Sequence, residues 1–382
     1  MLRHHTVVYR LKPPQGRSAA AALGFAAHLA KDQRAIRVYK ASRTSAGAKS
    51  EAFAVRASDE NEAREILEAL LEDPCVERAY GAPPRALAMR KVVGSSSHLD
   101  LSWRQQVRLP AAQGLSQWSA SKSVAVAIVD SGVDTTHPAL AHVKMNDYLL
   151  SPSTQLDPTG HGTHVTGLIA ARAQGGWTSE GVAASIADVT AHRGLTNVYD
   201  PVAYYRALRG ALTSARVVNL SISGDTEDDE ESDEIALAIA NGVVVVAAAG
   251  NEGEFNEELV PYPASLPGVI AVAAVDSADK VAGFSSQGMH VYVAAPGVDV
   301  GSTVPTYPVS SIVSVAIPSG ANLSGTSMAS PIVAGIVARI LSHRPDLSPS
   351  DVRDALRGDR CGCSALEVGV GRIDAEATMR HL

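Results

Sequence analysis

This 382-residue chain has few cysteines and no long hydrophobic segment, and each of these features excludes a class of protein or site. It contains no uncharged hydrophobic run of about 18 residues, so no membrane-spanning helix is expected. It has three cysteines, and Cys361 and Cys363 lie too close in sequence for an ordinary disulfide bond. Cys75 is far from both, and a lone C-x-C pair lacks the further ligands that a zinc site needs. The cysteine pattern therefore agrees with a reducing compartment and predicts no metal site.

The first residues do not show the pattern of a secretory signal peptide, and the chain has no excess of positive charge. Its first residues, MLRHHTVVYRLKPP, do not contain the apolar segment of a secretory signal. We therefore expect a cytoplasmic protein, or one that is exported by a non-classical route. The net charge of −7 argues against nucleic acid as a partner. Hydrophobic residues make up 46% of the chain, which is enough for a sizeable core and two domains.

Charge divides the chain into two parts. Residues 1–90 hold 15 lysines and arginines against 10 acidic residues, whereas the remainder holds 18 against 30. The first part is therefore positive and the second negative, so the two parts could attract each other.

Residues 1–90 show the pattern of a small α+β domain. Four strand-like segments and two helical ones alternate in the order βαββαβ, which predicts a ferredoxin-like sheet with two helices on one face. The segments are 6–11, 18–31, 36–41, 51–57, 59–73 and 75–80. In the second helix, Asp59 can cap the start with Glu62 three residues later. The pattern alone gives this domain no role in chemistry.

Short apolar segments in the second part are typical of buried parallel strands. They lie at 124–130, 217–223, 243–251 and 269–276, with helical stretches between them. Ligands of such sheets sit at the carboxyl ends of the strands. Asp130, Ser223 and Asn251 lie at or next to those ends. We therefore expect a functional site there.

Two further segments place polar residues at helix starts. The segment TSMASPIVAGIVARILSHRP predicts a buried helix with Ser327 at its beginning. The segment DPTGHGTHVTGLIA places His161 and His164 three residues apart at the start of another. That spacing alone admits a metal site, two packed core histidines, or the general base of a hydrolase.

Four segments together resemble the signature blocks of subtilisin-like serine proteases. They occur in that family's order, each in its expected strand or helix context, over roughly residues 105–382. The blocks are VAIVDSGVDTTHPAL, GHGTHVTGLIA, VVVVAAAGNEG and LSGTSMASPIVAG. The resemblance implies a three-layer α/β fold with a mostly parallel sheet in a catalytic domain of residues 91–382. Residues 1–90 resemble the family's propeptide, most clearly at LEDPCVERAY.

The resemblance assigns roles to four residues. Ser327 is the expected nucleophile, His161 the general base, and Asp130 the group that orients and stabilises the imidazole. Asn251 is expected to donate its amide to the oxyanion, beside the backbone N–H of Ser327. His164 matches a position that packs inside the fold. Neither a metal nor a cofactor is expected in this mechanism.

The resemblance also predicts how a peptide binds. An extended peptide pairs with an edge strand in this family, and its partners here are Ser221, Ile222, Ser223 and Gly224. Ser223 stands where glycine is usual, which narrows the entrance to the pocket for the residue before the cut. Ala248, Ala249 and Gly250 are expected to line that pocket, with Glu252 near its mouth.

Two departures from the family matter. Ala139 and the loop RAQGGWTSE replace oxygen ligands of a tight calcium site in secreted relatives, so we expect that site to be absent. The stretch at 301–322 is longer than usual. It is either an extra hairpin over the groove or, as we prefer, a variable surface loop.

The leading interpretation is a serine endopeptidase made as a zymogen, with its own residues 1–90 bound over the active site. The tail GAPPRALAMRK would lie in the groove, with the cut near Ala88 or Met89. One alternative is a dedicated cytoplasmic processing protease for one peptide or protein partner. Another is an inactive subtilase that serves as a binding module, against which the intact triad and Asn251 argue.

The acidic stretch GDTEDDEESDE at 224–234 also has two interpretations. It is either a solvated loop that favours the start of the next helix, or a rim of the cleft that selects Arg or Lys a few residues before the cut. In the second case Arg85 would lie next to it. Glu254, Glu257 and Glu258 were placed on the same rim.

Overall fold

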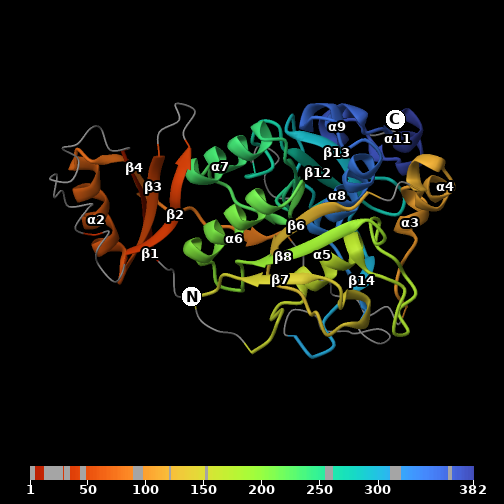
Figure 1. Ribbon diagram of the computed structural model, residues 1–382, viewed down its shortest axis with the longest axis horizontal. Coiled ribbons are helices and arrows are strands. Elements are labelled where there is room, and N and C mark those ends of the chain that lie inside the picture. The colour runs from red at the N-terminus through yellow and green to blue at the C-terminus, as the bar shows by residue number, and fades with distance from the viewer. Residues whose placement is uncertain are drawn as a thin grey trace.

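The computed structural model describes most of the chain, and its ribbon forms a small and a large lobe (Figure 1). The described residues are 5–12, 29, 35–43, 49–88, 98–119, 122–150, 154–253, 261–309, 320–359 and 364–382. We call residues 5–81 the small lobe and residues 98–382 the large lobe. The small lobe lies beside helices α6 and α7 of the large one.

The small lobe is an antiparallel sheet with the strand order β2-β3-β1-β4. Its strands are β1 (His5–Leu11), β2 (Ala35–Arg43), β3 (Lys49–Ala57) and β4 (Val76–Gly81). This is the order and pairing of a ferredoxin-like sheet, and all four strands were predicted. Of the predicted helix at 18–31, the structure describes only Leu29, which is helical and buried; the rest lies outside the described residues.

Helix α2 (Glu60–Glu72) begins as the sequence predicts, because Asp59 accepts a hydrogen bond from the backbone N–H of Glu62. The Glu62 carboxylate reaches back to the N–H of Ser58 rather than to Asp59. Ile66 and Leu70 are buried in the lobe's hydrophobic core. Leu71, the residue after Leu70, is 63% exposed.

A nine-stranded sheet forms the centre of the large lobe, with the order β16-β17-β13-β12-β11-β9-β6-β8-β7. All pairings are parallel except that of β16 with β17. The strands are β6 (Val124–Asp130), β7 (Lys144–Asp147), β8 (Ala187–Arg193), β9 (Val217–Leu220), β11 (Val244–Ala248), β12 (Ile270–Val275), β13 (Val291–Pro296), β16 (Gly358–Asp359) and β17 (Arg372–Ile373). The predicted mostly parallel sheet is confirmed.

Helices cover both faces of this sheet, which explains why its strands are continuously apolar. Val126 and Ile128 of β6 belong to the core that also contains α5 (His161–Ala170) and α8 (Thr326–His343). Ala127 and Val129 point to the other face, into the core shared with α6 (Pro201–Ser214) and α7 (Asp229–Ala240). The result is the three-layer α/β arrangement that the sequence predicted.

The remaining elements are short. They are β5 (Ala86–Leu87), α3 (Trp103–Gln106), α4 (Leu109–Gln113), η1 (Ser116–Ser119), η2 (Pro138–Leu140), β10 (Ile222–Ser223), β14 (Val300–Thr303), β15 (Gly320–Leu323), α9 (Pro349–Ala355), α10 (Ala365–Val368) and α11 (Ala375–His381). Strands β14 and β15 pair antiparallel. The ends of the long stretch at 301–322 are therefore a buried two-stranded ribbon rather than a surface loop; residues 310–319 lie outside the described part.

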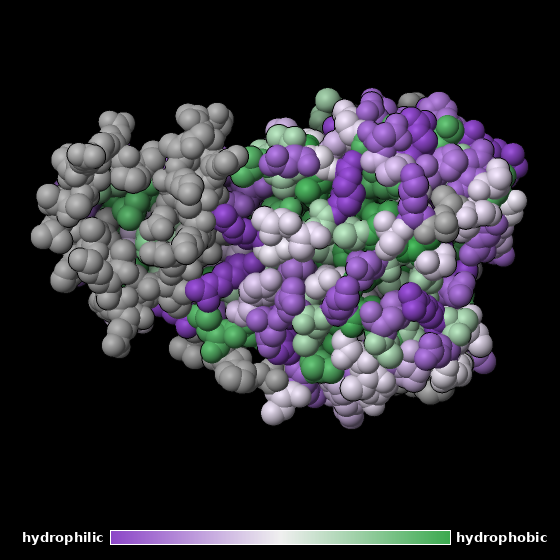
Figure 2. Space-filling view, in the orientation of Figure 1, coloured by the Kyte–Doolittle hydropathy of each residue, from purple (hydrophilic) through white to green (hydrophobic). Residues whose placement is uncertain are grey.

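The visible face of the large lobe mixes hydrophilic residues with small, separate hydrophobic areas (Figure 2). Among the residues that the structure describes, no helix has the length and hydrophobicity needed to cross a membrane.

Candidate active site

The residues expected to act in catalysis lie at the ends of secondary-structure elements. Asp130 is the last residue of β6, and His161 is the first of α5. Ser327 is the second residue of α8, and Asn251 follows the end of β11. Because parallel strands end at the same edge of the sheet, this topology gathers residues that are distant in sequence.

Asp130 and His161 form a buried pair. Nδ1 of His161 lies 2.8 Å and 3.0 Å from the two carboxylate oxygens of Asp130. Because an ionised carboxylate only accepts hydrogen bonds, this contact favours the tautomer with the proton on Nδ1. Nε2 is then free to accept a proton. It is buried and makes no hydrogen bond within the described parts of the chain.

Two glycines allow this pair to form. Gly160 precedes the helix with a φ of 77°, a backbone conformation that favours glycine. A Cβ on Gly162 would lie 2.1 Å from the carbonyl oxygen of Gly132 and 3.0 Å from Oδ1 of Asp130. The flanking glycines of the G-H-G sequence are compatible with a close approach to substrate. The close approach at Gly162 is instead to the end of β6, which sets the position of His161.

His164 does not face the same site. Its Nε2 lies 3.0 Å and 3.1 Å from the carbonyl oxygens of Val300 and Ala321, to which it donates from the packed interior. Burial lowers the pKa of His164 to about 3, so the ring stays neutral. This agrees with the packing role expected for His164.

Asp157, the nearest candidate for a third metal ligand, is fully engaged by its own loop. Oδ2 accepts hydrogen bonds from the backbone N–H and the hydroxyl of Thr163, and Oδ1 accepts from Gly160 and Ser131. Burial raises the pKa of this carboxyl. Across the described ranges, no three His, Cys, Asp or Glu side chains cluster so as to hold a metal ion.

Ser327 lies at the N-terminus of α8, where backbone N–H groups have no partner within the helix. Its N–H donates to the carbonyl oxygen of Ala88 at 3.1 Å. Its hydroxyl donates to the carbonyl of Ser221 at 3.0 Å, and the Ser221 hydroxyl donates to the carbonyl of Ser327 at the same distance. The backbone N–H of the expected nucleophile therefore already binds a carbonyl oxygen of the chain itself.

Asn251 is held against the same helix. Its Oδ1 accepts hydrogen bonds from the N–H of Thr326 at 2.9 Å and from its hydroxyl at 3.0 Å. Because the amide oxygen is engaged, the amide nitrogen is the end that remains to donate. Glu252 accepts a hydrogen bond from the backbone N–H of Asn251 at 2.7 Å. This fixes the loop that follows β11.

The predicted edge strand is paired with the chain's own tail. In the β10–β5 pair, Ile222 lies opposite Leu87 and Ser223 lies opposite Ala86. The N–H of Ala88 donates to the carbonyl of Ser221 at 3.2 Å. Residues 86–88 therefore occupy the groove as an added antiparallel strand.

The other predicted binding residues lie close to this strand or behind it. Gly224 exchanges backbone hydrogen bonds with Tyr262. Ala248, Ala249 and Gly250 are buried at the end of β11 and beyond it. Their role as walls of the pocket stays a prediction.

The acidic stretch is an exposed loop at residues 225–227, followed by the first turns of α7, in which only some of the acidic side chains are exposed. Asp228 caps α7 by accepting from the N–H groups of Glu230 and Glu231. Both glutamates are 0% exposed in the presence of the small lobe and its tail. Arg10 of β1 binds Glu230, and Arg85 binds Glu231. Glu252 apart, the other rim glutamates lie outside the described residues.

Three tyrosines contact the carboxylates of Asp228 and Glu231, and the sequence did not indicate these contacts. Tyr80 donates to Asp228 at 3.0 Å, Tyr205 donates to the other oxygen of Asp228, and Tyr204 donates to Glu231. The tyrosines of α6 sit in an amphipathic helix, so their sequence pattern indicates core packing. The opposite charges of the two parts and the expected proximity of Arg85 to the acidic stretch were the sequence features that indicated this interface, and Arg85 does lie against Glu231.

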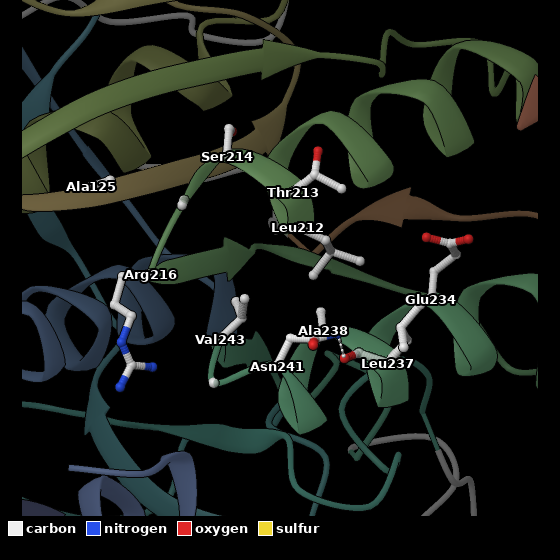
Figure 3. A pocket seen from close by; sticks show the side chains of 12 residues that line it. Ala125, Leu212, Thr213, Ser214, Arg216, Glu234, Leu237, Ala238, Asn241 and Val243 are labelled. Carbon is white, nitrogen blue, oxygen red and sulfur yellow. Dashed lines mark hydrogen bonds between the residues drawn. The ribbon is translucent and has the colours of Figure 1, made fainter. Parts of the chain in front are cut away.

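A surface hollow elsewhere on the large lobe has no comparable chemistry (Figure 3). It lies between the ends of α6 and α7, with Arg216, Glu234 and Asn241 among its lining residues. These residues precede β9 and β11 or lie on helices, so the hollow is at the amino ends of the strands, opposite the His161 site.

Comparisons with known proteins agree with this geometry. Residues 121–359 match the subtilase family, Peptidase S8. The chain is 36% identical to subtilisin DY of Bacillus licheniformis over 262 residues, which is 67% of this chain and 90% of that protein. It is 35% identical to subtilisin of Bacillus pumilus over 284 residues, 71% of this chain and 96% of that one. Thermitase of Thermoactinomyces vulgaris is 33% identical over 288 residues, 72% and 95% of the two chains.

A solved structure extends the likeness of fold to the small lobe. Fervidolysin from Fervidobacterium pennivorans, described as a keratinolytic enzyme related to subtilisin, superposes with a TM-score of 0.72 at 24% identity. The match covers 99% of this chain but 61% of the fervidolysin chain. At that identity the superposition carries information on the fold alone.

Proposed function

Because the chain belongs to the subtilase family and is a subtilisin-like serine endopeptidase, we propose that Ser327, His161 and Asp130 form its catalytic triad. Three observations support this assignment. Asp130 holds Nδ1 of His161, the opposite ring nitrogen is uncommitted, and Ser327 begins a helix whose N–H binds a peptide carbonyl.

In the proposed reaction, the Ser327 hydroxyl attacks the carbonyl carbon of the scissile bond while His161 Nε2 takes its proton. Asp130 stabilises the imidazolium that forms. The N–H of Ser327 and the amide nitrogen of Asn251 stabilise the negative oxygen. His161 then gives its proton to the leaving amine, and an acyl-enzyme remains. A water molecule, activated by the same histidine, hydrolyses that ester.

The Ser327 hydroxyl does not yet point to its base in this arrangement, since it donates to the carbonyl of Ser221. Rotation about the Cα–Cβ bond of Ser327 would redirect the hydroxyl. Catalytic hydrogen bonds often tighten only in the reacting complex.

We further propose that the enzyme is made as a zymogen whose residues 1 to about 90 assist folding and inhibit the active site. The observation that carries this proposal is the hydrogen bond from the Ser327 N–H to the Ala88 carbonyl oxygen. It supports cleavage after Ala88, because in the proposed mechanism the Ser327 N–H binds the carbonyl oxygen of the residue before the cut. The β5–β10 pairing gives the same residues the register of a bound peptide.

Mass spectrometry of the purified chain, beside the Ser327→Ala variant, tests both parts of the proposal. The wild-type chain should yield a fragment that ends at Ala88 or Met89, and the variant should stay intact. A wild-type chain that is never cut in that region would argue for a permanent accessory domain. Cleavage that persists in Ser327→Ala under single-chain conditions would remove Ser327 from the mechanism.

A further inference from the structure

We propose that Glu231 makes this enzyme select arginine at the fourth residue before the cleaved bond. This inference rests on the proposed function, because it names a substrate class for the same active site. With the Ala88 carbonyl at Ser327, Arg85 is the fourth residue on the amino side of the bond. Its partner, Glu231, lies in the first turn of α7.

The contact between Arg85 and Glu231 is bidentate and buried. Nε of Arg85 donates to Oε1 at 3.1 Å, and Nη2 donates to Oε2 at 2.6 Å. The two side chains are 1% and 0% exposed. Charge-assisted, two-point hydrogen bonds of this kind are both strong and geometrically selective.

The large lobe orients the Glu231 carboxylate independently of Arg85. The hydroxyl of Tyr204 donates to Oε1, and the backbone N–H of Glu231 is fixed by Asp228 at 3.0 Å. The start of α7 adds the partial positive charge of a helix N-terminus, which favours a carboxylate there. Burial raises the pKa of Tyr204 well above its usual value, so its hydroxyl stays a donor. The acceptor is thus held in place by residues that remain when the tail is replaced by a substrate.

Gly224 provides the space for the guanidinium. A Cβ at this position would lie 2.5 Å from Nη1 of Arg85 and 2.6 Å from the carbonyl oxygen of Pro84. A side chain at residue 224 would therefore collide with the bound arginine and with the peptide backbone. Glycine here leaves the path to Glu231 open.

Backbone pairing, rather than the small lobe, sets the position of Arg85. The arginine lies next to β5, whose Ala86 and Leu87 are in register with Ser223 and Ile222. A separate peptide that pairs with β10 in this register would place its own fourth side chain at Glu231. Arg10, by contrast, reaches Glu230 from strand β1 of the small lobe, so that contact exists only with the small lobe in place.

The chemistry of this site favours arginine over other residues. Burial alone lowers the pKa of Arg85, but Glu231 outweighs it and holds that pKa above its usual value. Lysine presents one ammonium group in place of a planar fork, so it cannot reproduce both bonds. A neutral side chain would leave a desolvated carboxylate with only its tyrosine partner, which costs binding energy.

The test uses the full-length chain after it has cut itself near Ala88 and its residues 1–88 have been removed, together with synthetic peptides that have the sequence of residues 81–91. Five peptides differ only at the position of Arg85, which carries arginine, lysine, citrulline, leucine or alanine. Citrulline has nearly the shape of arginine without its charge. We expect kcat/KM for the arginine peptide to exceed that for citrulline by roughly tenfold to a hundredfold, with lysine between them.

Two variants assign the preference to one carboxylate. Glu231→Gln should lower kcat/KM for the arginine peptide to near the value for the citrulline peptide, so that the preference for arginine over citrulline disappears. Glu234→Gln removes a charge from the same helix, where Glu234 pairs with Arg209 at 3.3 Å, and should preserve the preference. Far-UV circular dichroism and the thermal unfolding midpoint of each variant, compared with those of the wild-type enzyme, show whether it is folded.

Each outcome decides between the two proposals. Equal cleavage of the arginine and citrulline peptides, with Ser327-dependent hydrolysis intact, would overturn the specificity and leave the endopeptidase function standing. A preference that survives in Glu231→Gln would overturn the role of Glu231. Failure to hydrolyse any peptide in a Ser327-dependent way would overturn the proposed function, and the specificity with it.

Discussion

The backbone N–H of Ser327 donates a hydrogen bond to the carbonyl oxygen of Ala88, 239 residues earlier in the chain, at 3.1 Å. The same residue thus offers a hydroxyl for attack and an amide for the oxygen that becomes negative. The acceptor belongs to the chain's own backbone. The N–H group that would stabilise the oxyanion in the proposed mechanism therefore also holds the proposed inhibitory tail.

The triad assignment predicts a sharp difference between two neighbouring histidines. Ser327→Ala and His161→Ala should abolish peptide hydrolysis, and a fluorophosphonate probe should label Ser327 in the wild-type chain. His164→Ala should lower thermal stability instead, because it removes a packed side chain and leaves two buried carbonyl groups without their donor. Near-wild-type turnover by His161→Ala would show that the base lies elsewhere.

Substitution of Gly162, the residue after His161, should lower the rate of peptide hydrolysis strongly. A methyl group at Gly162 overlaps the Gly132 carbonyl and approaches Asp130, so Gly162→Ala must shift the Asp130–His161 pair. Displacements near 1 Å can cost roughly a hundredfold in rate, and we expect a fall in kcat of that order. Gly283→Ala, where a Cβ meets nothing within 4 Å, is the matched control. Equal activity of the two variants would contradict the proposed alignment.

The small lobe should inhibit in trans, and Glu230 should carry much of its affinity. Residues 1–90 added to the processed enzyme should block hydrolysis at micromolar concentration. Glu230→Gln leaves the buried Arg10 guanidinium without its carboxylate and should weaken inhibition roughly a hundredfold or more. Asp233, whose side chain is 52% exposed, contacts the same arginine, and Asp233→Asn should have a much smaller effect. Absence of inhibition by the wild-type segment would refute the inhibitor role.

Two buried histidines predict a loss of stability in mild acid. Burial lowers the pKa of His164 to about 3 and that of His192 to about 4. In the unfolded chain both titrate near pH 6.5, so below that pH the unfolded state binds protons that the folded state excludes. Their contribution is fully present above about pH 6.5 and falls by about 1.4 kcal/mol per pH unit for each histidine as the pH drops towards 4.

Urea unfolding of the Ser327→Ala chain at pH 7.5, 6 and 5 measures this slope without self-digestion. His192→Gln should be less stable at pH 7.5 but show a shallower decline, since one of the two titrating groups is gone. An identical slope in the variant would rule out His192 as a contributor.

Calcium should add little to stability. Ala139 lies buried in η2, and an alanine side chain offers no oxygen ligand where the secreted relatives place one. The melting temperature should therefore change little when EDTA replaces millimolar calcium, because an ion that does not bind the native state cannot stabilise it. A large decrease in EDTA would reveal a site elsewhere in the chain.

The candidate site could be located from sequence mainly because four segments resemble a known family, and that resemblance assigned roles to Asp130, His161, Asn251 and Ser327. The strand before Asp130 and the helices that start near His161 and Ser327 have strong local patterns, and parallel topology then brings their ends together. Strand β8 was not predicted: ADVTAHR alternates apolar and polar residues but lacks the continuous apolar run by which the other buried strands were recognised.

The environment of Glu230 and Glu231 could not be predicted in the same way. A run of acidic residues normally lies in solvent, and nothing in its local sequence indicates burial. Its partners, Arg10 and Arg85, lie 220 and 146 residues away, so the pairing depends on how the two lobes dock. The sequence indicated these contacts only through the opposite charges of the two parts and through the expected position of Arg85 in the groove, and it gave no indication of the contact between Arg10 and Glu230.

The Arg85–Glu231 contact has an evolutionary consequence. Both partners are inherited in one gene product, and maturation would use the same recognition as later substrates. A mutation at either position would therefore be selected first on the protein's own activation. Among descendants of this sequence, positions 85 and 231 should therefore change together. The residue at position 85 would then indicate which side chain the mature enzyme accepts four residues before the cleaved bond.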